Sequence, residues 1–248
     1  MDIAGIPERA ALAQVAGIAT AIHHLDAIDF GSVFASPSAR LTQFLSPFDR
    51  AFVWMNDDDG AITQTLTDLG IDEVQCFPGI PPDNWHASAA QYYADCIGTK
   101  IEVPFHLLVE AHATAHDLII QPGSGSAKKN WGMERFQELA RELEKQGRHV
   151  SWCYGPTEAA FSHGTNTLPQ LPLTELAAIL ANTKLFIGND SGINHLASVV
   201  GCPTIAIFGP TNSAVWQPIG PHTHIIQGNP WPTVATVLQE VGREKFEG

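Results

Sequence analysis

Short apolar runs alternate along the chain with segments whose apolar residues have the spacing of an amphipathic helix. The clearest unit starts with a strand predicted at 117–121, passes through a Gly-Ser loop and continues with a helix predicted at 133–146. Four apolar residues share one face of that helix: Phe136, Leu139, Ala140 and Leu143. Gly147 ends the helix, and the pattern then predicts a strand at 149–154.

The alternation continues on both sides of this unit. Further helices are predicted at 12–25, 39–45, 88–97, 173–183, 192–200 and 233–246, and further strands at 50–55, 184–190 and 203–209, with another starting at residue 73. Strands separated by helices are typical of βαβ units, so we expect an α/β fold with parallel sheets. A chain of 248 residues with 44% hydrophobic residues is long enough for one large domain or two smaller ones.

The charge balance narrows the range of partners. Thirteen Lys and Arg against 26 Asp and Glu give a formal net charge of -13. Such a chain repels nucleic acids and anionic membrane surfaces, so we expect no nucleic-acid partner and at most peripheral membrane contact. The four cysteines are far apart and lack CxxC spacing, which favours reduced thiols in a cytoplasmic protein. No apolar run has the length of a membrane span, and no export-signal pattern is recognised at the N-terminus.

The segment FIGNDSGINHL at 186–196 joins a predicted strand directly to a predicted helix. Backbone N–H groups at a helix N-terminus lack intrahelical partners, and the helix dipole favours negative charge there, so the turn formed by Asp190, Ser191 and Gly192 could hold a phosphate. Gly192 would let the ligand approach the backbone, and His195 could donate to a phosphate or sugar oxygen. The alternative is that Asp190 or Ser191 only caps the helix and that His195 is a packing residue.

A second loop of this kind, QPGSGSAKKNW, also follows a strand and precedes a helix. Its small residues are Ser124, Gly125 and Ser126, and the pair Lys128 and Lys129 would add positive charge suited to a diphosphate. The alternative is a solvated lysine pair ahead of an ordinary helix. After the strand at 149–154, Glu158 could accept both hydroxyls of a ribose, or it could be a surface glutamate.

These segments carry a family resemblance. PGSGSAKKNWGMERFQELARELEKQG, YGPTE and LFIGNDSGINHLASVVGCPTIAIFGPTNSAVWQPIG resemble the C-terminal nucleotide-sugar domain of glycosyltransferase family 9, which includes the ADP-heptose:lipopolysaccharide heptosyltransferases. The resemblance covers about residues 117 to 228. It implies two Rossmann-like domains of the GT-B type, with a shortened acceptor-side domain at 1–105 and a donor-binding domain at 106–248.

The resemblance also implies roles for single residues. It assigns the donor diphosphate to the motif that contains Asp190, Ser191, Gly192 and His195, and a phosphate contact to Lys129, which follows Ser124, Gly125 and Ser126 in the second loop. It assigns the ribose to Glu158 and the border of the sugar site to Thr211. The implied donor is a nucleotide-diphosphate sugar similar to ADP-heptose, and the implied acceptor is a lipopolysaccharide core or another glycan.

The start of the sequence departs from the family pattern. Family members begin with a strand and a Gly-Asp turn whose aspartate is the presumed base, whereas MDIAGIPERAALAQVAG is similar to the family's second strand and the helix after it. No catalytic residue is therefore assigned. Asp26, Asp29 and the carboxylates of NDDDG at 56–60 are candidate substitutes, but a solvated turn is the favoured interpretation of all of them. The function we expect is sugar transfer, with impaired activity in this chain. A non-catalytic nucleotide-sugar-binding module and a sugar-nucleotide epimerase are the alternatives.

A metal site is the remaining candidate. His106, His112 and His116 have spacings that a metal could use, and the last two would share a face if they were helical. The surrounding EAHATAHD has the character of a linker and there is no HExxH motif, so we expect neither a metal ion nor another cofactor.

Overall fold

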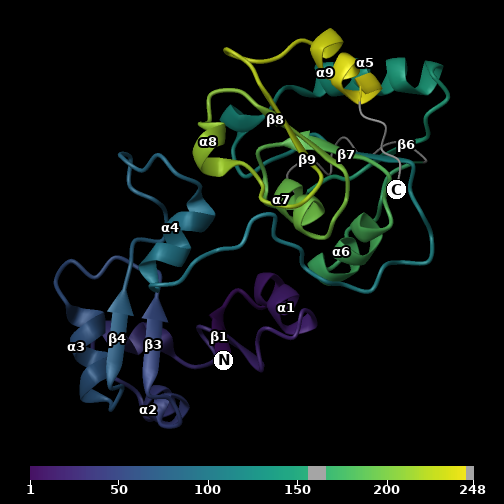
Figure 1. Cartoon of the computed structure of the whole chain (residues 1–248). Coiled ribbons are helices and arrows are strands. Elements are labelled where there is room, and N and C mark those ends of the chain that lie inside the picture. Colours follow the sequence, from purple (N-terminus) through teal and green to yellow (C-terminus); the bar gives the residue numbers. More distant parts are fainter. Residues whose placement is uncertain (156–165, 244–248) are drawn as a thin grey trace. The chain divides into compact units, whose positions relative to one another are not determined.

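The computed structural model describes residues 1–155 and 166–243, and the chain divides into two compact units, Met1–Lys100 and Ile101–Gly248. The first unit contains β1 (Asp2–Gly5), α1 (Pro7–Val15), β2 (Ala21–His24), η1 (Phe30–Phe34), α2 (Ala39–Leu45), β3 (Arg50–Val53), α3 (Ala61–Asp68), β4 (Glu73–Cys76) and α4 (Ala89–Cys96). The second contains β5 (Leu118–Gln121), η2 (Ala127–Lys129), α5 (Met133–Lys145), β6 (Val150–Trp152), α6 (Leu173–Ala181), β7 (Phe186–Asn189), α7 (Gly192–Val199), β8 (Thr204–Phe208), α8 (Ser213–Trp216), β9 (Thr223–Gln227) and α9 (Val234–Arg243). Figure 1 labels most of these elements along the chain.

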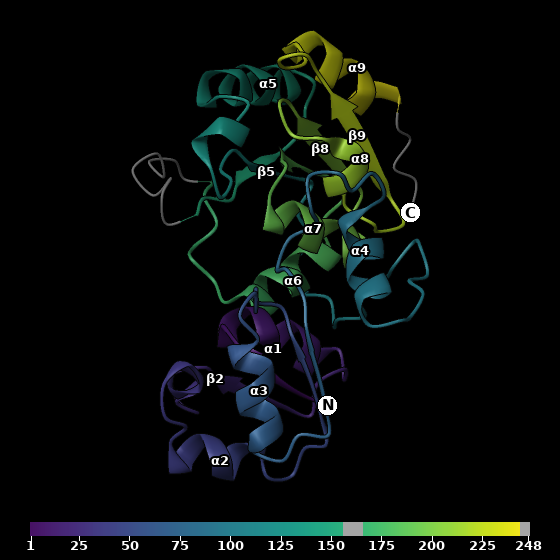
Figure 2. The same ribbon diagram turned by 90° about the vertical axis from the view of Figure 1, so that its left-hand side faces the viewer.

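The second unit is built on a five-stranded sheet with the order β6-β5-β7-β8-β9, in which every neighbouring pair is parallel. Its strands β5, β7 and β8 are buried along their whole length, because helices cover both faces. Helices α5 and α9 pack together on one face, and α6 and α7 lie on the other (Figure 2). The α/β fold with parallel sheets is therefore confirmed.

The core on the α5 and α9 side follows the predicted helix pattern. The four predicted apolar residues of α5 are all buried there: Phe136, Leu139, Ala140 and Leu143. They belong to the same core cluster as Leu118 and Ile120 of β5. Gly147 has a φ of 85°, a left-handed conformation that ends α5 as predicted. Burial of this helix face holds α5 against the sheet.

The first unit holds two separate two-stranded parallel sheets, β1-β2 and β3-β4. The helix predicted at 12–25 is wrong in its second half, because α1 ends at Val15 and residues 21–24 form β2 against β1. Gly17 has a φ of 71° and turns the chain between the two elements. Pairing with β1 therefore overrides the helical periodicity of this segment.

Helix α3 and strand β9 were not predicted. Helix α3 carries three threonines, which are weak helix formers, but its buried Ile62 and Leu66 pack into the core of the first unit with Leu41 and Leu45. Helix α3 therefore forms because its apolar face is buried and because Asp57 accepts hydrogen bonds from the N–H groups of its first turn, not because of high helix propensity. No helix within residues 1–155 and 166–243 is long and apolar enough to cross a membrane.

Candidate functional site

The candidate site lies where the strand order of the second unit changes direction. The connection from β5 leads through α5 to β6 on one side of β5, whereas β7 pairs with the opposite side of β5. The loops after β5 and β7 thus leave neighbouring strand ends at the carboxyl edge in opposite directions, which is the arrangement that forms a crevice in open α/β sheets. Ligands of open α/β sheets bind at such a switch point. Both loops singled out in the sequence are the ones that border it.

An ion pair connects the two loops. Lys129 Nζ, at the end of η2, lies 2.9 Å from Asp190 Oδ2, at the end of β7. The Asp190 side chain is 6% exposed and that of Lys129 is 37% exposed, so the carboxylate is buried beneath a partly accessible ammonium. Within the described residues, Asp190 Oδ2 accepts no hydrogen bond apart from this ion pair. Lys129 Nζ also lies 5.9 Å from the ring centroid of Trp216 in α8.

Asn189 fixes the spacing between the same two loops. Its Oδ1 accepts a hydrogen bond of 2.9 Å from the Trp131 backbone N–H, and its Nδ2 donates to the Pro122 carbonyl at 2.6 Å. Asn189 is fully buried, so both bonds are shielded from water. The loop after β5 is held at its beginning and its end by one side chain of β7.

Ser191 and Asn194 set the start of α7. Ser191 is the N-cap residue: its Oγ accepts from the Asn194 N–H at 3.2 Å and donates to Gln121 Oε1 at 2.9 Å. Asn194 Nδ2 donates to the carbonyls of Gly188 and Asn189, both at 3.0 Å. The predicted capping role of Ser191 is therefore present, and it leaves the first two N–H groups of α7, at Gly192 and Ile193, without intrahelical partners.

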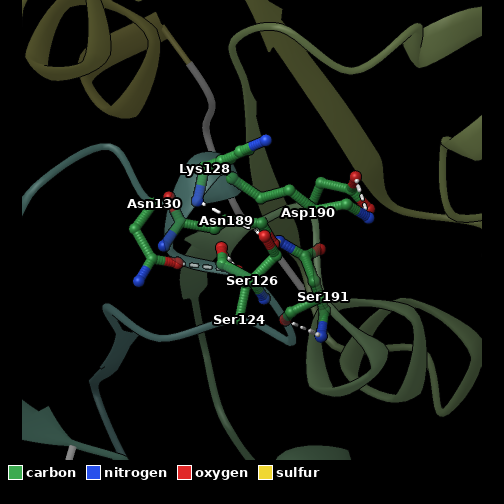
Figure 3. A network of polar contacts seen from close by, with 9 residues as sticks. Ser124, Ser126, Lys128, Asn130, Asn189, Asp190 and Ser191 are labelled. Atoms are coloured by element: carbon green, nitrogen blue, oxygen red, sulfur yellow. Dashed lines mark hydrogen bonds and ion pairs between the residues drawn. The ribbon is translucent and has the colours of Figure 1, made fainter.

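The Gly-Ser loop is ordered by its own serines. Ser124 Oγ lies 2.7 Å from both the Ser126 carbonyl and Asn130 Oδ1, and it accepts from the Ser126 N–H at 3.2 Å. Figure 3 shows Ser124, Ser126 and Asn130 on one side, facing Asp190 and Ser191 on the other. The two predicted loops are thus brought together by the fold.

Two glycines leave open space at this edge. A Cβ placed on Gly192 or Gly125 would meet no heavy atom within 4 Å, and neither residue has a left-handed φ. The backbone conformation therefore does not require glycine at these positions. The open space at Gly192 lies directly over the N-terminus of α7, where an anion would approach the backbone.

His195 is half-buried in the first turn of α7. Burial lowers the pKa of its imidazole, Asp190 raises it, and the Lys129 charge lowers it further, with a net decrease. His195 is consequently neutral at pH 7 in the free protein. A neutral ring can donate one hydrogen bond to a ligand, and a bound anion would favour its protonation.

We therefore expect that a bound diphosphate takes up a proton through His195. The negative charge of the ligand opposes the burial effect and raises the pKa of His195, so the complex binds more protons than the free protein near pH 6 to 7. Calorimetric titration of ADP at pH 6.5 in two buffers of different ionisation enthalpy measures this uptake. His195→Asn should reduce it, whereas His222→Asn, an exposed histidine, should not; equal uptake by all three proteins would contradict the expectation.

The other predicted residues have separate positions. Thr211 is half-buried in the loop after β8, the strand next to β7, so it lies at the same sheet edge. Glu158 lies outside the described residues. Lys128, next to Lys129, is exposed. Sequence reasoning did not select Gln121, Asn130, Asn189, Asn194 or Trp216. The available signal was that Asn189 and Asn194 are polar amides between apolar residues of the motif FIGNDSGINHL.

The candidate bases and metal ligands are dispersed. Both carboxylate oxygens of Asp57 accept hydrogen bonds from the N-terminus of α3, and the Asp26 side chain is 93% exposed beside His24. Asp29 is in a turn before η1 with a left-handed φ of 57°. His116 contacts Ser151 and His112 accepts from the Thr114 N–H. No group of three His, Cys, Asp or Glu in the described ranges could hold a metal ion together.

Comparison with known proteins gives consistent matches. The sequence model of glycosyltransferase family 9 (heptosyltransferase) matches residues 67–241 of this chain. Lipopolysaccharide heptosyltransferase 3 of Escherichia coli K12 is 30% identical over 115 residues, which are 42% of this chain and 33% of that protein. The aligned part spans about a third of the length of this relative and of the next, lipopolysaccharide heptosyltransferase 1 of Pseudomonas aeruginosa.

Solved structures extend the similarity of fold to the whole chain. ADP-heptose LPS heptosyltransferase II of Escherichia coli superimposes with a TM-score of 0.72 at 17% identity, covering 98% of this chain and 88% of that one. At this identity the likeness speaks for the fold alone. It shows that the arrangement of strands and helices described above is that of GT-B heptosyltransferases.

Proposed function

This chain belongs to glycosyltransferase family 9, the heptosyltransferase family, and from that premise we propose that its second unit binds the diphosphate of an ADP-sugar at the crevice between β5 and β7. The observation that carries the proposal is the Lys129–Asp190 ion pair, which joins the two loops at the switch point beside the open N-terminus of α7. The whole protein's reaction would then be transfer of a heptose-like sugar to a lipopolysaccharide core or another glycan.

The proposed site distributes the charge of the diphosphate over several groups. The N–H groups of Gly192 and Ile193 and the dipole of α7 would contact one phosphate. Lys129 would contact the other phosphate. Its side chain is 37% exposed, so one N–H of the ammonium can donate to the phosphate while another stays directed at Asp190. Asp190 would keep the lysine in place rather than contact the anion itself, because the carboxylate is buried and negative.

The same groups would assist the chemical step. When the bond between the sugar and the diphosphate breaks, negative charge develops on the leaving phosphate oxygen. Helix N-terminal N–H groups and an ammonium that are already in place stabilise such charge without reorganising. The role proposed for Glu158 at the ribose and for Thr211 at the sugar completes the donor site. No residue is proposed as the base.

The test is a titration of ADP and of pyrophosphate into the chain. We expect ADP to bind more tightly than pyrophosphate, because the nucleoside adds contacts that pyrophosphate lacks. Binding of ADP, together with sugar transfer from ADP-heptose to a lipopolysaccharide acceptor in an activity assay, would support the full function. ADP binding without transfer would support the binding-module alternative, and absence of ADP binding would reject the proposal.

Gly192→Ala is a sharper variant for the same site. The new methyl group meets no protein atom within 4 Å, and alanine favours a helix over glycine, so the stability should be unchanged or slightly higher. The methyl would nevertheless occupy the space over the α7 N-terminus, and we expect ADP affinity to fall about tenfold, ~1.4 kcal/mol.

The control for this variant is Gly242→Ala, in α9. Its Cβ also meets nothing within 4 Å, so it tests the same substitution away from the crevice. Calorimetry should show unchanged ADP affinity for Gly242→Ala. If Gly192→Ala binds ADP as tightly as this control, the diphosphate does not lie over α7.

A further inference from the structure

Trp216 contacts charged or ionisable residues from both sides of the proposed donor site. It is the last residue of α8, the short helix that follows β8, and β8 is the neighbour of β7 in the sheet. The side chain of Trp216 is half-buried. A third segment, in addition to the loops after β5 and β7, therefore reaches this edge of the sheet.

The indole ring of Trp216 faces the ammonium of Lys129. Lys129 Nζ lies over the ring, 5.9 Å from its centroid, and the same nitrogen is 2.9 Å from Asp190 Oδ2. An ammonium within about 6 Å of an indole face is attracted by the electron-rich ring. The distance is close to this limit, so the attraction is modest, but it acts on a group that the ion pair already restrains. The ring adds this restraint without adding a second negative charge that would repel a phosphate.

The main chain of Trp216 contacts His195, the other ionisable group of the site. Its N–H donates to the Asn212 carbonyl at 3.1 Å, within α8. Burial is the main cause of the lowered pKa of His195, and a hydrogen bond with the Trp216 backbone is one of the interactions that counteract it. A hydrogen bond that favours the charged imidazolium is one in which the ring donates, so the acceptor is the Trp216 carbonyl. A protonated ring then has a second N–H for an anion.

The backbone that carries Trp216 is held by groups other than the indole ring. Asn212 caps α8, since its Oδ1 accepts from the Ala214 N–H at 3.0 Å. Val215 and Pro218, on either side of Trp216 in the sequence, are both buried. We therefore expect the Trp216 carbonyl to stay in place when the ring is replaced by a smaller side chain, which makes the two contacts of this residue separable by experiment.

We infer that Trp216 is a positioning residue of the diphosphate site: its ring holds the Lys129 ammonium beside Asp190, and its main-chain carbonyl orients the His195 ring. The inference rests on the proposed function, because these contacts affect ligand binding only if the diphosphate lies between Lys129 and the start of α7. It adds the segment after β8 as a third support of the site. Trp216 acts through Lys129 and His195 and does not itself contact the anion.

Calorimetric titration of ADP into Trp216→Leu and Trp216→Phe tests the role of the ring. We expect the affinity to fall about threefold to fivefold in Trp216→Leu, and less in Trp216→Phe, because phenylalanine restores an aromatic face. In the Lys129→Met background both substitutions should change the affinity less than about twofold, since the ring then has no charge to hold. Proton uptake on ADP binding at pH 6.5 should persist in Trp216→Leu, because the carbonyl that orients His195 is still present.

The control is Trp85→Leu, which replaces a half-buried tryptophan of the first unit that packs against Tyr92 and should leave ADP binding unchanged. Three results would overturn the inference: unchanged affinity in Trp216→Leu, an equal loss with and without Lys129, or a loss of proton uptake together with affinity, which would give Trp216 a merely structural role.

The unmodified chain separates this inference from the proposed function. If it binds no ADP, the donor site itself is rejected, and the positioning role with it. If it binds ADP and Trp216→Leu binds ADP equally well, only the positioning role is rejected. Circular dichroism checks that the variants are folded, and if Trp216→Leu is not, Trp216→Phe with and without Lys129→Met provides the same comparison.

Discussion

Replacing Lys129 by methionine is expected to weaken ADP binding by about tenfold to a hundredfold, which corresponds to ~1–3 kcal/mol. Methionine keeps the length of the side chain but removes the charge that the crevice offers to a diphosphate. The loss should be large because Lys129 is held at 2.9 Å from Asp190 before any ligand arrives, so little ordering is required on binding. Calorimetric titration of ADP measures the change.

The same variant leaves the buried carboxylate of Asp190 without its ion-pair partner. A fully buried charge that loses its partner costs about 3–5 kcal/mol, and since the Lys129 side chain is 37% exposed we expect a smaller decrease in the free energy of unfolding, about 1–2 kcal/mol. Lys129→Met combined with Asp190→Asn should recover most of that stability but not the affinity. This double-mutant cycle separates binding from folding.

Lys128→Met is the matched control, because Lys128 is the exposed neighbour in the same short helix. It should change ADP affinity much less than Lys129→Met does. If Lys129→Met is folded and binds ADP like the unmodified chain, Lys129 does not contact the diphosphate. A larger effect from Lys128 would assign the contact to the other lysine.

Asn189→Ala is expected to give the largest loss of stability. It removes both partners that Asn189 provides, so the Trp131 N–H and the Pro122 carbonyl are left buried without hydrogen bonds. Each unsatisfied buried group costs about 1–3 kcal/mol, so the two together predict a decrease of about 2–6 kcal/mol in the free energy of unfolding of the second unit. ADP affinity should fall too, since the loop after β5 loses its anchor to β7.

Urea unfolding followed by circular dichroism tests this, and the transition that ADP shifts identifies the second unit. Asn182→Ala is the control. It removes a single hydrogen bond of 2.7 Å to the His112 carbonyl at the surface, and should cost less than about 1 kcal/mol. Equal losses for Asn182→Ala and Asn189→Ala would mean that the loops of the crevice are not held by Asn189.

Much of the second unit can be predicted from its sequence because periodicity and packing agree there. Phe136 and Leu143 lie on the predicted face of α5, and Gly147 ends the helix through a left-handed backbone conformation. The first unit was harder to predict, because residues 21–24 have helical spacing but pair with β1. Long-range strand pairing is invisible in a local pattern.

The candidate site was predicted as two loops but not as one crevice. That Lys129 meets Asp190 depends on the strand order β6-β5-β7, which no motif specifies. Asn189 was overlooked because its role arises from contacts with Trp131 and Pro122, which lie far away in sequence.

The two hydrogen bonds of Asn189 span 58 and 67 residues of sequence. Contacts with such separation close large loops, and their entropic cost is recovered only after the strands between them have paired. During synthesis, a chain that has released β5, α5 and β6 but not β7 lacks the partner of its first loop, so the proposed donor site is not yet formed. The proposed site would form only in a late step, when β7 pairs with β5.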